Sequence, residues 1–420
     1  MDLLQDLEFR ELIFQATAED ELRKKLQSGP ITLYIGFDPT ADSLHIGSLL
    51  PILGLRRFQL AGHNPIALVG GGTGMIGDPS GKTVERGLNP KELVEEWTVL
   101  IRRQLERFLD FDTSVNPARI TNNYQWLGSL EVIPFLRDVG KYFSVSNMVS
   151  KESVKARLAT GLSYTEFTYM ILQSYDFLRL FQDYGCEMQA GGSDQWGNIT
   201  AGIDLIRRLD NGKAYGLTFP LATKADGSKF GKTESGTVWL DPAKTTPYQF
   251  YQFWINTDDA DVIRFIKHFT FLSKEEILNL DEEVRNNPGK RESQRVLAKI
   301  VTTMVHGAEA MNKVEKISQA LFYGKIRDLE EDEVAAGLAD VPSITIPPEK
   351  ETSLVDLLVE SGASPSKRQA REDLKNRAIS LNGELADDPQ RFLAVGDRLF
   401  NKYTIIRRGK KNYFLVKWLS

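Results

Sequence analysis

Short apolar runs and longer periodic segments alternate along the first half of the chain. The runs ITLYIGFD, residues 31–38, and PIALVGGG, residues 65–72, are typical of buried strands. Between them, residues 44–63 carry apolar side chains at helical spacing, and Gly62 near their end is a helix stop signal. The chain therefore begins with a strand–helix–strand pattern.

The same alternation continues to the end of the first half. Further helices are predicted over 89–109, with Asn89 at the N-cap and Pro90 in the first turn, and over 163–185, ending at Gly185. Segments with strand character follow at residues 186–194 and 214–223. This rhythm predicts an α/β fold with a parallel sheet that carries helices on both faces.

The character of the sequence changes after the α/β part, which we place at residues 1–223. Residues 224–244 are polar, glycine-rich and basic, which indicates a mobile surface loop and linker. Residues 245–323 have helical patterns almost throughout and predict an all-α domain. Residues 324–352, with a proline-bearing stretch, are expected to be a linker. The last segment, 353–420, shows helix patterns and then strand patterns, so a small α+β domain is predicted.

Charge is distributed unevenly between the two ends of the chain. The 420 residues carry a net charge of −5. Residues 361–420 hold 13 Lys and Arg against 6 Asp and Glu, whereas the other residues hold 39 against 51. A basic terminal segment on an acidic body favours a nucleic-acid-binding appendage, although a well-solvated surface would have the same composition.

Other bulk features narrow the class of protein. The single cysteine, Cys186, excludes a disulfide within the chain, and zinc-finger spacings are absent. No apolar run is long enough to span a membrane, and residues 1–15 have the pattern of an acidic amphipathic helix rather than a signal peptide. We therefore expect a cytoplasmic protein.

The glycine-rich stretch GGGTGMIGDPSGK fits neither conventional nucleotide motif. Gly72, Gly74 and Gly77 match G-x-G-x-x-G. However, Pro79 follows too closely for the helix whose N-terminus would hold a pyrophosphate. A Walker loop also fails, because the position that needs its first glycine is Ile76.

Two separated segments suggest a different way of binding phosphate. His45 and Gly47 lie at a predicted helix start, where unpaired N–H groups and the helix dipole favour an anion. Much later, KFGKT places Lys229 and Lys232 in a glycine-bearing loop, where two ammonium groups could close on a triphosphate. Each segment alone has an ordinary alternative, a capped helix with an incidental histidine or a basic solvated loop.

Together, these two segments resemble the paired signature motifs of class I aminoacyl-tRNA synthetases. The motifs LYIGFDPTADSLHIG, ALVGGGTGMIGDPSGK, YTEFTYMILQSYDF, GGSDQWGNITAG, and SPSKRQARED with IIRRGKKNY resemble, in this order, the bacterial tyrosyl-tRNA synthetases. The resemblance implies a Rossmann-like catalytic domain, a helical anticodon-side domain and a small RNA-binding domain of the ribosomal-protein type. It also implies a homodimer formed through the catalytic domains.

The reaction implied by this family has two steps. The carboxylate of L-tyrosine attacks the α-phosphate of ATP, giving tyrosyl-adenylate and pyrophosphate, and the 3′ end of tRNA(Tyr) then takes the tyrosyl group. Such a reaction needs positioning and stabilisation of phosphate charge rather than a protein nucleophile. Mg²⁺ would arrive with ATP, so no dedicated protein metal cage is expected.

The family also implies which residues bind tyrosine. Three of them, Tyr169, Gln173 and Asp176, are spaced i, i+4 and i+7 in one predicted helix and therefore share one helix face. The implied residues are Tyr34 and Asp176 for the substrate hydroxyl, Asp78, Tyr169 and Gln173 for the α-ammonium group, and Gln195 near the carboxylate.

A second implied set binds ATP. Ser48 stands where the family usually has a second histidine, and a serine is shorter and cannot carry positive charge. Ile35 stands where relatives can carry a small polar group near the ribose. Positions around the adenylate are Gly36, Asp38, Gly47, Gly192 and Asp194, and those for the phosphates are Thr40, His45, Ser48, Lys82, Arg86, Lys229, Lys232 and Thr233.

Basic clusters in the last segment are implied to bind tRNA, since such clusters neutralise phosphates. They are Lys367, Arg368 and Arg371 at helical spacing, and Arg407, Arg408, Lys410 and Lys411 in a turn between strands. Trp196 is expected near the acceptor end. Two alternatives are a tryptophanyl-type class I synthetase and a non-catalytic RNA-binding protein that reuses the scaffold. Tyr34 with Asp176, and the full-length tail, favour tyrosine over tryptophan.

Overall fold

The computed structural model describes residues 2–82, 84, 87–158, 161–227, 230–233, 236–409 and 412–419, with only the backbone of Ser153, Lys232 and Thr233. The chain divides into two compact units. The first comprises Met1–Lys244 and Ile255–Val301, and the second comprises Thr245–Trp254 and Thr302–Ser420. Both units contain parts of the helical domain expected over 245–323, so the domain boundaries stay a prediction.

The first unit is built on a six-stranded sheet in the order β1-β6-β5-β2-β3-β4. Its strands run parallel, except that the short β1 is antiparallel to β6. The parallel sheet confirms the predicted α/β class, while β1 and β4 lie outside the predicted elements. The strands are β1 (Gln15–Ala16), β2 (Thr32–Phe37), β3 (Asn64–Val69), β4 (Arg119–Asn122), β5 (Cys186–Gly192) and β6 (Tyr215–Phe219).

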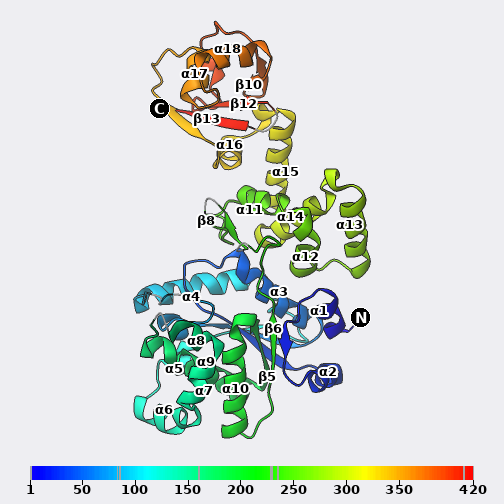
Figure 1. Ribbon diagram of the computed structural model, residues 1–420, viewed down its shortest axis with the longest axis vertical. Coiled ribbons are helices and arrows are strands. Elements are labelled where there is room, and N and C mark those ends of the chain that lie inside the picture. The colour runs from blue at the N-terminus through cyan, green and yellow to red at the C-terminus, as the bar shows by residue number, and fades with distance from the viewer. Residues whose placement is uncertain are drawn as a thin grey trace. The chain divides into compact units, whose positions relative to one another are not determined.

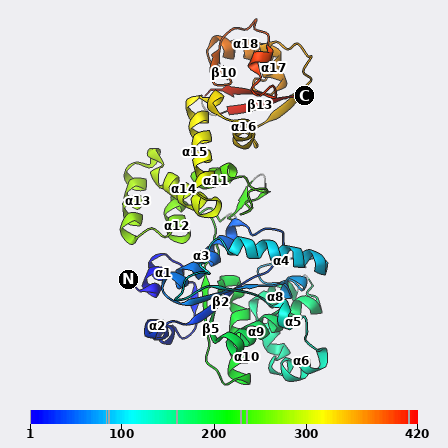
Figure 2. The same ribbon diagram turned by 180° about the vertical axis from the view of Figure 1, so that it is seen from behind.

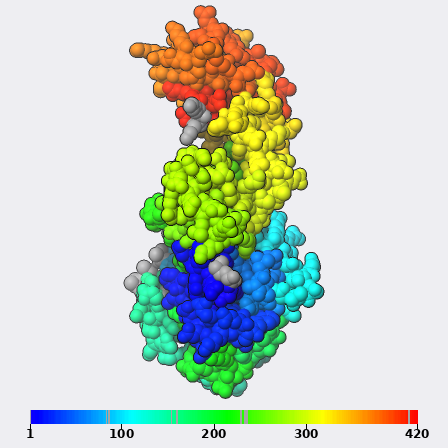
Figure 3. Space-filling view, turned by 90° about the vertical axis from the view of Figure 1, so that its right-hand side faces the viewer, coloured from blue at the N-terminus to red at the C-terminus, as the bar shows by residue number. Residues whose placement is uncertain are grey.

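Helices cover both faces of this sheet. α3 (Ile46–Leu60) and α4 (Lys91–Leu105) lie on one face, and α9 (Tyr164–Tyr184) and α10 (Trp196–Leu209) lie on the other (Figures 1 and 2). The N-terminal segment, dark blue, forms part of the surface of the first unit (Figure 3). Shorter helices are α1 (Leu3–Phe9), α2 (Glu19–Ser28), α5 (Tyr124–Leu127), α6 (Val132–Asp138), α7 (Val145–Ser150) and α8 (Glu152–Leu158).

The ends of α9 follow from its local sequence. The Ser163 side chain accepts a hydrogen bond from the Glu166 backbone N–H at 3.2 Å, and Gly185 closes the helix at a φ of 61°, which suits glycine. In contrast, Pro90 occupies the N-cap position of α4, without a side-chain hydrogen bond. The expected N-cap at Asn89 is therefore wrong, because the chain enters this helix one residue later.

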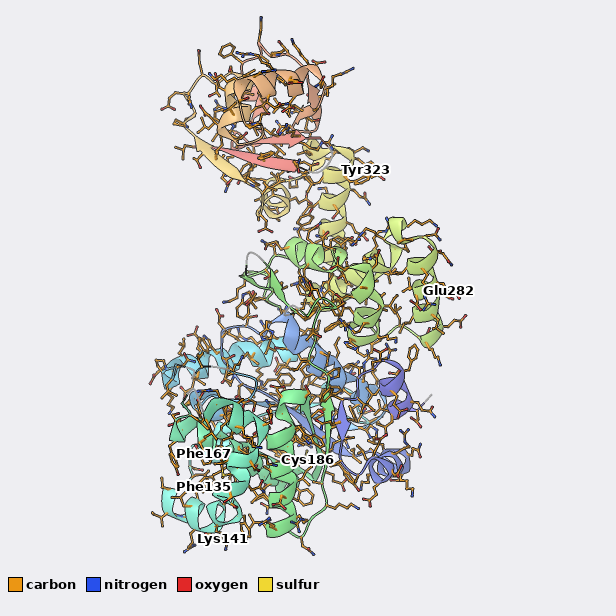
Figure 4. All side chains as sticks on the ribbon, in the orientation of Figure 1. Phe135, Lys141, Phe167, Cys186, Glu282 and Tyr323 are labelled. Carbon is orange, nitrogen blue, oxygen red and sulfur yellow. The ribbon has the colours of Figure 1, made fainter. Side chains whose placement is uncertain are left out.

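The inner face of α9 belongs to the core of the first unit. Phe177 on this helix lies 5.3 Å from the ring of Tyr34 on β2, measured between centroids, and both side chains are buried. Phe135 and Phe167, labelled in Figure 4, pack against the same core cluster. Polar groups on this helix face are therefore held against the sheet by close packing.

A short hairpin and several helices follow the sheet along the chain. The hairpin pairs β7 (Lys232–Thr233) with β8 (Gly236–Thr237) in antiparallel fashion. The helices α12 (Asp259–Phe269) and α13 (Lys274–Asn286) belong to the first unit. Residues of α11 (Pro247–Ile255) and α14 (Glu292–His306) fall in both units.

The second unit contains a five-stranded sheet in the order β11-β10-β12-β13-β9. Its sheet is mixed, since β9 runs parallel to β13 whereas the other pairs are antiparallel. The strands are β9 (Ser343–Ile346), β10 (Ile379–Leu381), β11 (Glu384–Ala386), β12 (Tyr403–Arg408) and β13 (Asn412–Trp418), and the helices are α15 (Ala308–Tyr323), α16 (Glu331–Gly337), α17 (Leu354–Glu360) and α18 (Lys367–Lys375).

Strand β9 and helix α16 occupy the segment expected to be a linker. The prolines in this segment, Pro342, Pro347 and Pro348, flank β9 rather than interrupt it. Because β9 is an edge strand, it needs hydrogen bonds on one side only, and the Pro342 carbonyl accepts one from Leu415 N–H at 2.9 Å. The segment thus completes the C-terminal sheet.

Candidate functional site

A cavity of about 290 Å³ lies at the carboxyl ends of β2 and β5. The chain runs from β2 outward to β3 and from β5 outward to β6, so these two adjacent strands flank the point at which the strand order reverses. Open parallel sheets bind their ligands at such a point. The cavity brings together the predicted residues Tyr34, Gly36, Asp38, Thr40, His45, Gly47, Ser48, Asp78, Tyr169, Gln173, Asp176, Gly192, Asp194 and Gln195.

Tyr34 and Asp176 line the same cavity and are each 1% exposed. The Tyr34 hydroxyl is buried without a hydrogen-bond partner among the described residues. Burial raises its pKa well above the usual value for tyrosine, so the hydroxyl keeps its proton. Burial also raises the pKa of the Asp176 carboxyl to about 8, against the opposing effect of two hydrogen bonds that it accepts. A hydroxyl group of a ligand could pair with both side chains.

Two residues that the motif comparison did not include hold Asp176. Asn123 Nδ2 donates to one carboxylate oxygen at 2.8 Å, and Trp126 Nε1 donates to the other at 2.7 Å. Both follow β4 in the polar stretch TNNYQW. A polar cluster directly after a strand at this sheet edge is the sequence signal that would have indicated them, but β4 itself was not predicted.

The helix face of Tyr169 and Gln173 meets a polar network. The Tyr169 hydroxyl donates to Asp38 Oδ2 at 2.7 Å, and Gln195 Nε2 donates to Asp78 Oδ2 at 2.6 Å. Gln195 Oε1 in turn accepts a hydrogen bond of 3.3 Å from Gln173 Nε2. Asp78, Gln173 and Gln195 are therefore already linked to one another, whereas Tyr169 is bonded to Asp38, a residue predicted for the adenylate.

One further polar residue in this network was missed. Asn198 Nδ2 donates to Gln173 Oε1 at 3.0 Å and to Gln195 Oε1 at 3.2 Å. Asn198 is 3% exposed and lies in the first turn of α10. Its position at the end of the DQWGN stretch gave no separate signal, because its partner Gln173 comes from a different helix.

His45 forms the N-cap of α3 at the outer part of the cavity. Its Nδ1 accepts a hydrogen bond from Gly47 N–H at 3.0 Å, so the neutral ring carries its proton on Nε2. A Cβ atom at Gly47 would lie 2.8 Å from His45 Cε1. Glycine at this position therefore lets the imidazole fold back over the helix N-terminus. Ser48, which follows, lines the same cavity.

Lys82 lies outside this cavity. It lines a neighbouring hollow of about 450 Å³, and Thr40 lines both hollows. The walls of the second hollow come from the glycine-rich segment, including Gly74 and Gly77. An extended ligand such as a triphosphate could continue from the first hollow past Thr40 towards Lys82.

Several predicted residues lie outside what the structure describes. They are Arg86, Lys229, Lys410 and Lys411, and for Lys232 and Thr233 only the backbone in β7 is described. Within the described residues, no group of three or more His, Cys, Asp and Glu side chains could hold a metal ion. None of the helices described is long and apolar enough to cross a membrane.

The basic residues of the second unit fall into two kinds. Lys367, Arg368 and Arg371 are exposed on α18. Arg408 instead donates to the Ala363 carbonyl at 3.1 Å and forms an ion pair with the buried Asp373 at 3.0 Å. Arg408 thus has a structural role within this unit.

Comparison with known proteins places the chain in a family. The family described as "tRNA synthetases class I (W and Y)" matches residues 26–323, and a "Tyrosine--tRNA ligase SYY-like C-terminal domain" matches residues 333–416. The chain belongs to the class I tRNA synthetases. The family resemblance seen in the motifs is therefore confirmed.

Curated relatives narrow this family to its tyrosine branch. The tyrosine–tRNA ligase of Bacillus caldotenax is 60% identical over 419 residues, covering 100% of each chain. Tyrosine–tRNA ligase 1 of Bacillus subtilis is 59% identical over 99% of each chain. These full-length matches confirm the predicted enzyme class, an ATP-dependent tyrosine–tRNA ligase, over the tryptophanyl-type alternative.

Solved structures support the fold. A C-terminally truncated mitochondrial tyrosyl-tRNA synthetase of Aspergillus nidulans superposes with a TM-score of 0.70 at 29% identity, covering 76% of this chain and 94% of that one. A tryptophanyl-tRNA synthetase of Plasmodium falciparum gives a TM-score of 0.52 at 12% identity, covering 79% and 87%. The second likeness concerns the fold alone.

Proposed function

We propose that the chain activates L-tyrosine with ATP to tyrosyl-adenylate and pyrophosphate, and then transfers tyrosine to the 3′ end of tRNA(Tyr). One observation carries this proposal. A single cavity is lined by a buried hydroxyl–carboxyl pair, Tyr34 and Asp176, and also by the helix N-terminus capped by His45. The hydroxyl–carboxyl pair suits a phenol, and the helix N-terminus suits a phosphate.

The tyrosine side chain would bind with its hydroxyl between Tyr34 and Asp176. The Asp176 carboxylate would accept a hydrogen bond from the phenolic O–H, and the Tyr34 hydroxyl would donate one to the phenolic oxygen. With phenylalanine, the buried Tyr34 hydroxyl would stay unpaired, and Asp176 would keep only its hydrogen bonds from Asn123 and Trp126. Sites of this kind reject the analogue that lacks the hydroxyl by roughly 10⁴–10⁵-fold, a range established with this enzyme class rather than worked out from these contacts.

The other end of the amino acid would meet the network of Asp78, Tyr169, Gln173 and Gln195. Asp78 supplies negative charge for the α-ammonium group, and the amide nitrogen of Gln195 lies beside it. This arrangement orients the carboxylate for attack on the α-phosphorus. A new oxygen–phosphorus bond forms as the bond to pyrophosphate breaks, so the chain need supply no nucleophile.

ATP would lie along the outer part of the cavity. Gly36, Gly192 and Asp194 suit the adenosine part, with Asp194 as a partner for ribose hydroxyls. His45 Nε2–H, together with Thr40 and Lys82, would stabilise charge that builds up on the leaving pyrophosphate. We propose that Mg²⁺ enters bound to the ATP phosphates, as is usual for this hard cation. The KFGKT lysines would complete the phosphate contacts.

For tRNA, we propose the exposed α18 side chains Lys367, Arg368 and Arg371 as phosphate contacts. The single cysteine, Cys186, is buried and free, which suits the reducing cytoplasm in which we place the reaction. The domain boundaries given by the sequence stay part of this proposal, with tyrosine and ATP bound by residues 1–223 and the KFGKT loop supplied by residues 224–244.

We also propose a homodimer formed through the first unit. Apolar side chains are exposed on successive helices from α6 to α9, and monomeric surfaces rarely gather so many. A charge at the most exposed of these side chains, Ile133→Glu, should shift the sedimenting species from dimer to monomer. An unchanged mass would remove this face from the interface. The exposed side chains are Val132, Ile133, Leu136, Val145, Leu158 and Tyr164.

The two chemical steps can be tested separately in a single-turnover experiment. Enzyme, ATP and labelled tyrosine should give a protein-bound adenylate, and added tRNA(Tyr) should convert it to charged tRNA with release of AMP. Protein that binds tRNA(Tyr) tightly but forms no adenylate with any amino acid would support the non-catalytic alternative. Adenylate formation without transfer would restrict the proposal to its first step.

A further inference from the structure

The segment that follows the KFGKT loop pairs directly with the start of α3. Ile46 N–H donates to the Val238 carbonyl at 2.9 Å, Leu240 N–H donates to the Leu44 carbonyl at 2.9 Å, and an isolated antiparallel bridge joins His45 to Trp239. The two signature segments are therefore neighbours through their backbones. The loop root and the N-cap of α3 cannot move independently without breaking these bonds.

The side chain of Trp239 lies against the His45 imidazole. Their ring centroids are 6.4 Å apart at an angle of 68°, an edge-to-face arrangement. The Nδ1 atom of His45 already accepts the hydrogen bond from Gly47 N–H. The hydrogen bond and the indole together restrict the imidazole to one orientation, which sets the direction of the Nε2–H bond.

Trp239 is itself held in place by a cation. Lys244 Nζ lies 4.8 Å from the centroid of the Trp239 ring and forms an ion pair with Asp42. Asp42 belongs to the DPTADSLHIG segment that leads to His45. The contacts therefore form a ring: Asp42 pairs with Lys244, Lys244 contacts Trp239, and Trp239 contacts His45, which follows Asp42 in the same segment.

The other end of the loop has an aromatic anchor. Phe230 stacks on Phe269 of α12 with centroids 5.3 Å apart and meets Phe265 edge-on at 4.9 Å. The chain between Phe230 and Trp239 is thus attached at both ends to fixed parts of the first unit. A tryptophan at the second attachment can transmit the position of the loop to the histidine.

We propose that Trp239 is a positioning residue that orients His45 for the triphosphate and couples this orientation to the root of the KFGKT loop. The inference rests on the proposed function, in which His45 contacts the phosphates. Trp239 itself does not line the cavity, so it acts through His45 rather than on the substrate. A residue outside the cavity can affect the rate in this way, because even a small displacement of a group that contacts the reacting phosphates lowers the rate.

The kinetic test uses Trp239→Leu, Trp239→Phe, His45→Ala and the double variant Trp239→Leu/His45→Ala. In wild type, Trp239→Leu should lower the rate of adenylate formation about tenfold and leave the tyrosine KM within about twofold, because only the phosphate end is disturbed. Trp239→Phe, which keeps an aromatic ring, should recover most of the rate. In the His45→Ala background, Trp239→Leu should cost less than about twofold, because the residue through which it acts is gone.

Equal losses from Trp239→Leu in both backgrounds would overturn the proposal and leave Trp239 a merely structural residue. Trp97→Leu on α4 is the matched control, since Trp97 is also half-buried and does not line the cavity. Thermal unfolding of every variant separates loss of fold from loss of positioning.

A second readout does not depend on activity. The chain has four histidines, so the imidazole Hε1 signals of protein labelled in its histidine rings can be assigned with His45→Ala. Trp239→Leu should shift the His45 signal, through loss of the indole ring current, while Trp97→Leu should not. A His45 signal with the same chemical shift in Trp239→Leu as in wild type would contradict the contact between the two rings and overturn the proposal. Wild type without tyrosine-dependent adenylate formation would instead refute the proposed function and leave this measurement standing.

Discussion

Replacing Trp126 by phenylalanine tests how the enzyme prepares Asp176 for tyrosine. The change keeps a six-membered aromatic ring and removes the pyrrole part of the indole with its Nε1–H donor, which lies 2.7 Å from the carboxylate. Both side chains are buried, with 8% and 1% exposed, so water cannot easily replace the lost donor. A hydrogen bond to a charged group contributes about 1.5–3 kcal/mol. We therefore expect Trp126→Phe to destabilise the ionised form of Asp176.

The magnitude follows from the pKa of Asp176. Each pKa unit corresponds to about 1.4 kcal/mol, so losing this bond should raise the pKa by about one to two units. The starting value is about 8. At pH 8 the ionised fraction would fall from about a half to about a tenth or less, and the tyrosine KM would rise about 5- to 50-fold. The ATP KM should change less than about twofold.

The assay is tyrosine-dependent ATP–pyrophosphate exchange at pH 8, with tyrosine and ATP varied separately. Trp97→Phe on α4 serves as the control for loss of an indole N–H, because it lies away from the cavity. A tyrosine KM within twofold of wild type for Trp126→Phe would refute the reasoning that this donor supports the charge of Asp176.

Three further predictions follow from the described contacts. Because burial raises the Asp176 pKa from 3.8 to about 8, kcat/KM for tyrosine should rise with pH between 6 and 8, while the free energy of unfolding of the ligand-free protein should fall as pH rises from about 4 to 8 and level off above 8; a flat activity profile would contradict this. Ser48→His should change the ATP KM or the activation rate severalfold and leave the tyrosine KM alone, and unchanged ATP kinetics would mean that Ser48 contributes little. Arg408→Ala should lower the free energy of unfolding of the C-terminal unit by about 1–3 kcal/mol, because the buried Asp373 loses a charged hydrogen-bond donor although a third of the Arg408 side chain is exposed. Arg368→Ala should leave stability unchanged and weaken tRNA binding with a smaller salt dependence, so equal melting losses in the two variants would contradict the distinction.

The helix face of α9 could be predicted because its information is local. Ser163 and Gly185 set its ends, and the spacing of Tyr169, Gln173 and Asp176 sets its inner face. Helical periodicity then brings these three side chains into one cavity with Tyr34. The local sequence was therefore enough to predict helix α9 and the three residues that it contributes to the tyrosine-binding part of the cavity.

The partners of these side chains could not be predicted in the same way. Asn123, Trp126 and Asn198 act on Asp176 and Gln173 from other elements, and only the folded sheet edge brings them together. The same limit applies to β9, whose four residues become a strand only through pairing with β13. Long-range pairing, rather than propensity, decides such positions.

The basic composition of the last segment does not show which of its basic side chains are free to contact RNA and which hold the fold together. Arg408 looks like one more basic residue in a cluster, yet its guanidinium faces the buried Asp373 and the Ala363 carbonyl. Lys367, Arg368 and Arg371 lie on an exposed helix face with the same composition. Sequence alone could not separate the two groups, because the distinction depends on the tertiary contact that brings Arg408 of β12 against Asp373 of α18.

Amino-acid selectivity of ATP–pyrophosphate exchange tests the central claim most directly. With ATP and magnesium fixed, tyrosine, phenylalanine and tryptophan should be compared by kcat/KM on the wild-type chain. The pairing of Tyr34 and Asp176 with the substrate hydroxyl predicts that tyrosine exceeds phenylalanine by roughly 10⁴-fold or more, with no measurable exchange for tryptophan. Exchange driven by tryptophan, or by phenylalanine as well as by tyrosine, would contradict the account.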